Sequence, residues 1–325
     1  MITRYKLLAW LSGLPLTLLG LVTFLAGVLP VVTGYVSATS GLALGYSLLL
    51  INLVFAILVR EKIKNNPFLL LFHMALLLML LAVGVSRLTY FKGWVQISPD
   101  MPITEPTGVI SKGPWHPNAF KKTRVALLDF EANYGSDGRY QSIRSLLQVG
   151  NSQQPTLIDD SQTADILGYQ FTQSSNIGFA LSFVWMATDG TLVQGVSHFP
   201  SQTAYPETQG IDLQLPGVEK PIWIGLDIVS KRQDFFTPEF RVPDDYSYTV
   251  MSTSGPQMVT PNSAVSLPEG QLMLNGLVPW IGYELYYDPS IYFLLFTSLI
   301  GVCALAIFLW QRQVKTSWIL ENDDE

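Results

Sequence analysis

The sequence predicts a membrane protein of α+β class. It has four transmembrane helices, three N-terminal and one C-terminal, and an extracytoplasmic β-rich domain between the third and fourth helices. Only 14% of its 325 residues are charged and 49% are hydrophobic, whereas a soluble domain has roughly 25% charged residues. Apolar stretches of about 20 residues, the length that crosses a bilayer, lie near both ends of the chain. The long segment between them alternates short apolar runs with glycine and proline, which is typical of strands and turns.

The four predicted spans cover residues 7–32, 41–59, 67–86 and 290–310. The first follows a basic start, as a signal peptide does, but its apolar region is too long for one and a second span follows closely. We therefore expect it to be retained as a helix. Proline disturbs helices, so we expect a kink at Pro15 and the outer end of the helix near Pro30.

The basic residues near the span ends predict the orientation. If the helices alternate in direction, one side of the membrane receives all of these residues: Arg4, Lys6, Arg60, Lys62, Lys64, Arg312 and Lys315. That side is the cytoplasm by the positive-inside rule. The chain then divides into a three-helix region (1–91), an extracytoplasmic domain (92–288), a fourth helix (289–311) and a cytoplasmic tail (312–325). Arg87 and Lys92 are a weak opposing signal, because long domains translocate largely regardless of charge.

Strand and turn signals recur through the predicted outer domain. Residues 179–188 and 191–197 flank Asp189-Gly190, which predicts a hairpin with a type I′ turn. A strand over 125–134 with a turn at 135–138 is also expected. Further strands are expected over 222–229, 246–251, 272–274 and 280–287. Short strands at this spacing predict a sandwich or an open barrel.

Charge and cysteine content exclude several functions for this domain. Residues 93–288 carry 10 Lys/Arg and 20 Asp/Glu, a formal charge of −10, which disfavours binding to nucleic acid or anionic lipid. The single cysteine, Cys303, lies in the fourth span, so an intrachain disulfide and a Cys-x-x-Cys redox motif are both excluded. The sequence also has no Cys-x-x-Cys-His, no glycine-rich phosphate loop and no nucleophile elbow. No catalytic constellation is predicted.

His73 is the only histidine inside a predicted span. An ionisable ring at membrane depth is costly and marks a candidate functional site. Two interpretations are open from the residues alone: a polar contact between helices, or an axial ligand to haem iron. Helical spacing puts His73 on one stripe with Leu77, Leu80, Gly84 and Arg87, where Gly84 would admit a flat ligand or another helix. His73 lies about two turns from the cytoplasmic helix end, so a bound haem would lie in the inner half of the bilayer.

The other histidines, His116 and His198, lie beside prolines in loop-like sequence. Two histidines without cysteine or suitably spaced carboxylates are a weak metal signal, so we expect ordinary surface or hydrogen-bonded side chains. The aromatic residues around the fourth span are explained by anchoring at the membrane interface. These residues are Tyr286, Tyr287, Tyr292, Phe293, Trp310 and Trp318.

The order of spans and several motifs resemble the ResB (CcsB) family of cytochrome c biogenesis proteins. Residues 72–97, from Phe-His-Met-Ala to Trp-Val-Gln-Ile, look like that family's third helix and exit. The sequence Leu-Leu-Asp-Phe-Glu-Ala-Asn-Tyr at 127–134 with Asp137-Gly138 resembles its "DF…Y…DG" strand and turn. The segment 166–175 resembles its "G-Y-x-F-x-Q" motif, and 280–289 its "G-Y…Y-D-P" lead into the last helix.

This resemblance implies a non-enzymatic, accessory role in System II cytochrome c maturation in the bacterial plasma membrane. With a multi-span ResC (CcsA) partner, such a subunit holds haem b and delivers it outward for attachment to apocytochrome c; thioredoxin-like thiol reductants are further partners. A histidine of the third helix is taken in this family to ligate haem opposite a histidine of ResC, and His73 is the matching position. The rival prediction is a scaffold subunit of another membrane complex. A sensor whose outer domain binds a solute is disfavoured. Such a protein would need a signalling module on the cytoplasmic side, and the 15 residues after Trp310 are too few to form one.

Overall fold

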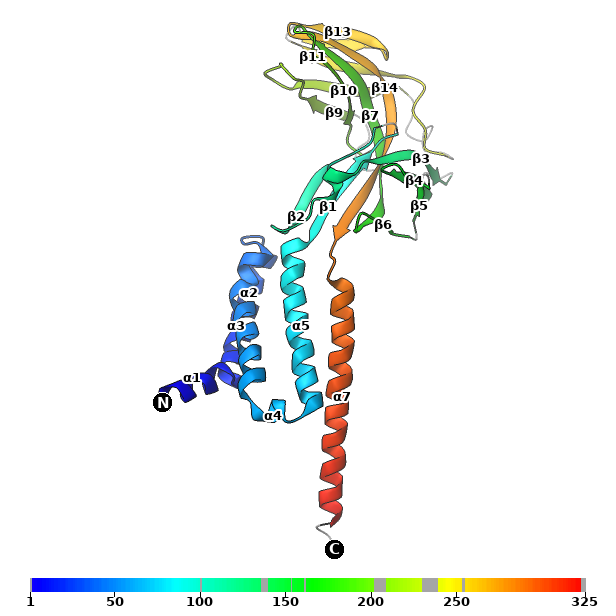
Figure 1. The fold of residues 1–325 in the computed structure, drawn as a ribbon. Helices are drawn as coiled ribbons and strands as arrows, with labels where there is room; N and C mark the ends of the chain where they lie inside the picture. The colour runs from blue at the N-terminus through cyan, green and yellow to red at the C-terminus, as the bar shows by residue number, and fades with distance from the viewer. Residues whose placement is uncertain are drawn as a thin grey trace. The chain divides into compact units, whose positions relative to one another are not determined.

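The computed structural model describes residues 2–99, 101–135, 140–152, 154–160, 162–201, 209–229, 239–252 and 255–322. The chain forms two compact units (Figure 1). Unit 1 comprises Met1–Tyr90, Gly113–Trp115 and Asp288–Glu325, and unit 2 comprises Phe91–Lys112 and His116–Tyr287. Unit 1 is helical, and unit 2 is built almost entirely of antiparallel strands.

The helices of unit 1 are α1 (Ile2–Leu11), α2 (Leu14–Val32), α3 (Ala38–Val59), α4 (Glu61–Lys64), α5 (Pro67–Thr89) and α7 (Ile291–Asn322). Four of these, α2, α3, α5 and the Ile291–Val314 part of α7, are long and apolar enough to cross a membrane. This confirms the prediction of three such helices before the β-rich segment and one after it. Together with the sheets of unit 2, they confirm the α+β class.

One detail of the helix prediction is wrong, and two features were not predicted. The first span is not one kinked helix: the chain breaks at Ser12 and Gly13, and Pro15 lies in the first turn of a new helix, where its missing N–H costs nothing. The basic segment after α3 forms the short helix α4. Helix α7 extends beyond the predicted fourth span to Asn322, because residues 311–322 contain no glycine or proline to end the helix.

Polar side chains of α3 stabilise the break between α1 and α2. The Asn52 side-chain amide donates to the carbonyl oxygens of Leu11 at 2.9 Å and Gly13 at 3.0 Å. Thr17 donates its hydroxyl proton to the Asn52 side-chain oxygen at 2.8 Å. The guanidinium group of Arg60 donates to the carbonyl oxygens of Ser12 and Ala9, both at 3.2 Å. The carbonyl groups that a helix end leaves without partners are therefore satisfied by side chains.

We expect Asn52→Leu to lower the stability of unit 1 by about 1–2 kcal/mol, because it leaves two backbone carbonyl groups without these donors in an apolar setting. The thermal unfolding midpoint of the full chain in detergent measures this loss. Thr23→Val is the matched control, since the Thr23 hydroxyl bonds only to carbonyl groups of its own helix, Leu19 and Gly20. Equal midpoints for the two variants would contradict the assigned role of Asn52.

A close contact and a capping network hold α5 and α7 together. On α5 and α7, a Cβ added to Gly301 would lie 3.3 Å from the Ala75 Cβ, so these two helices approach closely through small residues, as membrane helices often do. At one end of the same pair, Ser86 donates its hydroxyl proton to an Asp288 carboxylate oxygen at 2.8 Å. The other oxygen of Asp288 accepts from the backbone N–H of Ser290 at 3.0 Å. Asp288 thereby links the last turn of α5 to the start of α7.

The described residues of unit 2 form three antiparallel sheets, where the sequence predicted one sandwich or open barrel. The seven-stranded sheet has the order β2-β1-β14-β7-β6, with β13 paired to β14 and β8 to β7; the other sheets are β12-β11-β10-β9 and β3-β4-β5. The strands are β1 (Phe91–Ile97), β2 (Gly108–Lys112), β3 (Val125–Tyr134), β4 (Tyr140–Val149), β5 (Thr156–Asp159), β6 (Ala164–Ile166), β7 (Tyr169–Ala187), β8 (Leu192–His198), β9 (Gln209–Leu213), β10 (Ile222–Ile228), β11 (Tyr246–Ser252), β12 (Gly255–Val259), β13 (Ser263–Leu267) and β14 (Gly270–Tyr287). A 3-10 turn, η1, covers Ala119–Lys122.

The long neighbouring strands β7 and β14 support both smaller sheets (Figure 1). In the first half of β7, the Gln173 side chain accepts from the Ser145 hydroxyl of β4 at 2.8 Å. In the second half, the fully buried Trp185 donates its indole N–H to the carbonyl oxygen of Pro216, in the connection between β9 and β10, at 3.1 Å. One hydrophobic core includes residues from all three sheets, so a single apolar interior holds the unit together.

The predicted strands are found, but the hairpin turn differs. Strands β3, β7, β8, β10, β11 and β14 cover the expected segments, and 272–274 and 280–287 belong to one strand, β14. Between β7 and β8, Gly190 has φ +85° while Asp189 does not have a positive φ, so the turn is not type I′. The carboxylate of Asp189 accepts from the Thr191 N–H at 2.8 Å, which favours a longer turn with glycine alone in the left-handed region. Of the turn predicted at 135–138, residues 136–138 lie outside the described residues.

Candidate functional site

His73 lies in the second turn of α5. Asn66 caps the start of this helix by accepting from the Leu69 N–H at 3.0 Å, and Pro67 occupies the first turn, where its fixed φ suits a helix start. The apolar residues that follow form the rest of the span. The His73 ring is half-buried and packs edge to face with Phe72, with ring centroids 5.4 Å apart. The ring is thus presented from a regular, well-capped helix.

One ring nitrogen of His73 has a defined partner. Nδ1 lies 2.7 Å from the carbonyl oxygen of Leu69, one turn earlier in α5. A carbonyl oxygen can only accept, so Nδ1 carries the proton in this contact. In the neutral ring, Nε2 then keeps its lone pair. A backbone carbonyl bound to Nδ1–H is a common way to fix the ring orientation and tautomer of a metal-binding histidine.

On the face of α5 that carries His73, a side chain of the neighbouring helix α3 packs against Gly84. A Cβ added to Gly84 would lie 2.7 Å from the hydroxyl oxygen of Tyr46 on α3. That hydroxyl donates to the carbonyl oxygen of Leu80. Of the two roles expected for Gly84, the structure therefore shows the approach of a helix side chain. Arg87 packs beside Tyr90, 5.6 Å from its ring centroid, and lies about 21 Å along α5 from His73 by rise per residue.

The expectations for His116 and His198 are confirmed in part. Both are hydrogen-bonded and neither is an exposed surface residue. His116 is 6% exposed, has Nε2 2.5 Å from the Tyr169 hydroxyl, and stacks on Phe91. His198 is the last residue of β8 and not part of a loop. Its Nε2 lies 3.3 Å from the Ser98 hydroxyl.

We expect acid to destabilise unit 2 through His198. Burial lowers the pKa of His198 from 6.5 to about 4. Between these values the unfolded chain binds a proton that the folded chain does not, so stability rises with pH across this window and falls on acidification. The loss from pH 7 to pH 4 is about 3 kcal/mol, at 1.36 kcal/mol for each pKa unit.

Denaturant unfolding followed by tryptophan fluorescence at pH 7 and pH 4 measures this loss. The indole of Trp280 is a suitable reporter, since its ring centroid lies 5.9 Å from that of His198. In His198→Gln the amide does not titrate, so this variant should lose about 3 kcal/mol less on acidification than the natural chain. An equal loss in both proteins would show that His198 is not the group responsible.

The described residues contain no group of three or more His, Cys, Asp or Glu side chains placed to hold a metal ion. His73 is the single histidine among the described residues of the four long apolar helices. Comparisons with protein-family models and with curated proteins yield no match. The family assignment made from the sequence motifs stays a prediction.

Sequence reasoning missed two groups of polar residues. Asn52 is buried within α3, and its amide in an otherwise apolar span was a detectable signal. The other group lines a pocket on unit 2, where Gln96, Asn176 and Glu284 come from three strands far apart in sequence. No local pattern could have placed these three side chains together, because their proximity depends on the order of strands in the sheet.

Proposed function

We propose that this chain is a haem-handling subunit of cytochrome c maturation, resembling ResB, which supplies one axial ligand to a haem b within the membrane. The observation that carries the proposal is His73: its Nδ1–H is bound to the Leu69 carbonyl group, and the ring is only half-buried in an apolar helix. The lone pair of Nε2 is then available to bind a metal, and imidazole nitrogen is a common axial ligand of haem iron.

Residues of this chain would bind and orient the group in defined ways. His73 Nε2 would hold the iron, and the Leu69 carbonyl group would keep the ring in the tautomer that leaves Nε2 unprotonated. The apolar side chains of α5 would keep water from the site. Bound haem supplies a metal-centred porphyrin, which the complex presents for covalent attachment to apocytochrome c. The chain's own task is to hold it, so we propose no enzymatic step for this chain.

A split site would account for a single ligand. We propose that the second axial histidine comes from a multi-span partner of the ResC (CcsA) type, and that thioredoxin-like reductants keep the apocytochrome thiols reduced. We further propose the orientation that the basic residues predict: the membrane is a bacterial plasma membrane, the termini are cytoplasmic, and unit 2 is extracytoplasmic.

Co-purification tests this proposal. The chain, carrying an affinity tag, is expressed with a ResC-type protein, purified in detergent and examined by visible absorption, with the chain expressed alone as the control. We expect the partner to co-elute with a Soret band well above that of the chain alone. Failure to co-elute would contradict the proposed pairing. Co-elution without a Soret band would favour the scaffold role over haem handling.

A further inference from the structure

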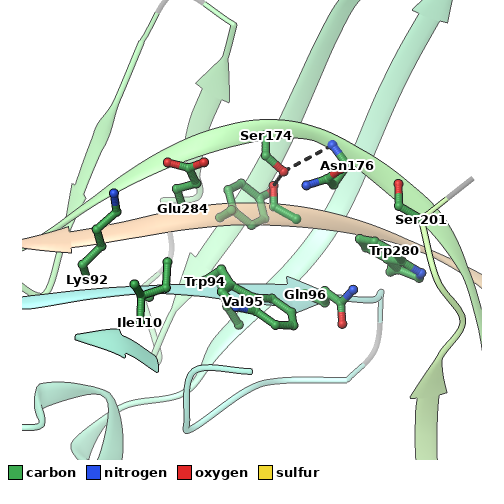
Figure 2. A pocket seen from close by; sticks show the side chains of 13 residues that line it. Lys92, Trp94, Val95, Gln96, Ile110, Ser174, Asn176, Ser201, Trp280 and Glu284 are labelled. Atoms are coloured by element: carbon green, nitrogen blue, oxygen red, sulfur yellow. Dashed lines mark hydrogen bonds between the residues drawn. The ribbon is translucent and has the colours of Figure 1, made fainter. Parts of the chain in front are cut away.

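A pocket of about 400 Å³ lies on the face of the seven-stranded sheet in unit 2, within the range of about 300–1,000 Å³ that is typical of small-molecule sites. Figure 2 shows Lys92 and Glu284 at one end of it and Asn176, Gln96 and Trp280 toward the other, with Trp94 between the two ends. Its floor is β14, which pairs with β1 on one edge and β7 on the other. The pocket belongs to unit 2 alone and is independent of His73.

A bulge in the sheet forms this hollow. Ile281 pairs with Ile177 and Tyr283 pairs with Gln173, so residues 174–176 of β7 lie opposite Gly282 alone. The Ser174 hydroxyl donates to the Gly282 carbonyl oxygen at 3.0 Å and bridges the gap. A Cβ added to Gly282 would lie 2.8 Å from that hydroxyl oxygen. Bulges often occur beside binding sites, where they redirect side chains, and this one turns the 174–176 segment toward the pocket.

The polar side chains in the pocket are available to a ligand. The carboxamides of Gln96 and Asn176 and the carboxylate of Glu284 line it, and no hydrogen bond with another described residue occupies these three groups. The backbone N–H of Gln96, in contrast, is already bound to the Thr107 hydroxyl oxygen at 2.9 Å. Two planar carboxamides and a carboxylate offer both donors and acceptors. That mixture suits hydroxyl groups, which donate and accept at once.

Aromatic surface accompanies these polar groups. Trp94 is 40% exposed and covers Gly108 of β2, where an added Cβ would meet the indole nitrogen at 2.3 Å. Trp280 also lines the pocket, with its indole N–H directed to the Phe179 carbonyl oxygen at 2.9 Å. The N–H of Trp280 is therefore engaged and its side chain is buried, so Trp280 forms part of the pocket wall and Trp94 is the indole that offers a ligand exposed ring surface.

Other ligand classes fit these groups less well. An anion such as a phosphate would meet one lysine, Lys92, in a domain of formal charge −10. A peptide adding as a strand needs an unpaired edge, but the floor strand β14 is paired on both edges. A lipid chain would have to desolvate Gln96, Asn176 and Glu284 without replacing their hydrogen bonds. None of these objections applies to a neutral ligand that has several hydroxyl groups and an apolar C–H face.

We propose that this pocket binds a pyranose ring, presented either by a free sugar or by a glycan chain. The apolar face of the ring packs against the indole of Trp94. Its hydroxyl groups bond to the carboxamides of Gln96 and Asn176 and to the carboxylate of Glu284. This arrangement combines aromatic surface with a few convergent polar groups, as small-molecule sites generally do.

Binding of defined sugars to the full chain tests the proposal. The chain is purified in a detergent without a sugar headgroup, because alkyl glycosides would compete. Tryptophan fluorescence is titrated with methyl glycosides of glucose, galactose, mannose and N-acetylglucosamine, and with an N-acetylglucosamine tetramer. We expect saturable binding of at least one probe at millimolar concentration or below. If the tetramer binds more tightly than its monomer, the pyranose ring is presented by a glycan chain. If the two bind equally, the ligand is a free sugar.

Three variants locate the site. Trp94→Ala and Asn176→Ala should each weaken binding roughly tenfold, which corresponds to about 1.4 kcal/mol, and both residues are exposed, so the fold should survive. Trp115→Ala is the matched control, because this exposed tryptophan does not line the pocket. The proposal is overturned if no probe saturates, or if Trp94→Ala and Asn176→Ala bind as the natural chain does.

Discussion

If this chain forms the proposed complex with a ResC-type partner, replacing His73 by alanine is expected to remove haem from it. The variant loses the one imidazole that α5 presents with its Nδ1 proton held by the Leu69 carbonyl group, so this chain would no longer supply a ligand to the iron. Since loss of an outer-shell partner alone costs about 10–100-fold in metal affinity, loss of the ligand itself should lower haem occupancy by at least roughly tenfold. The ratio of Soret absorbance to protein absorbance in the purified complex measures this occupancy.

Two further samples separate ligation from general damage to α5. Leu77→Ala changes a residue on the same stripe of the helix, one turn further along, and should retain haem. Added imidazole should restore absorption to His73→Ala, because the free base can occupy the space that the ring leaves. A Soret band of unchanged height in His73→Ala would exclude His73 as the ligand. Equal losses in Leu77→Ala and His73→Ala would indicate disruption of the helix instead.

Trp185→Ala is expected to cause the largest loss of stability in unit 2. Trp185 is fully buried in β7, and its indole N–H is bound to the carbonyl oxygen of Pro216, which lies between β9 and β10 of the four-stranded sheet. Truncating a buried tryptophan costs about 3–5 kcal/mol through lost contacts and the cavity left behind, and the Pro216 carbonyl group loses its donor. In a unit of this size that corresponds to a fall of roughly 10 °C in the unfolding midpoint.

Thermal unfolding of the full chain, followed by circular dichroism at a wavelength dominated by strands, measures this fall. Trp115→Ala serves as the control, because Trp115 is 69% exposed and its removal leaves no cavity. A midpoint for Trp185→Ala within about 2 °C of the control would contradict the view that one core unites the three sheets.

Much of the fold could be predicted because its signals are local. An apolar run of about 20 residues can be recognised without knowing what it packs against, and the strand at Val125–Tyr134 was placed at its observed bounds. The break at Ser12 and Gly13 could not be predicted in this way. Carbonyl groups freed there are satisfied by Asn52 and Arg60, some 40 residues along the chain, so the break depends on a tertiary contact.

The same distinction applies to the candidate sites. His73 was found from the sequence because an imidazole among apolar residues is a contrast visible at one position. Its hydrogen bond to Leu69 is also local, one turn away in the helix. His116 was expected to be ordinary, and its burial against Phe91 and Tyr169 arises only when separate strands come together. The bulge opposite Gly282 is likewise a property of strand register, which periodicity alone does not specify.

Electron paramagnetic resonance of the oxidised complex with a ResC-type partner tests the central claim most directly, because the signal of ferric haem reports its axial ligands. With the natural chain we predict a low-spin signal of the kind given by two imidazole ligands, one of them from His73. In His73→Ala we predict that the remaining haem gives a high-spin signal instead. An unchanged low-spin signal in the variant would contradict the account, since both axial ligands would then come from elsewhere.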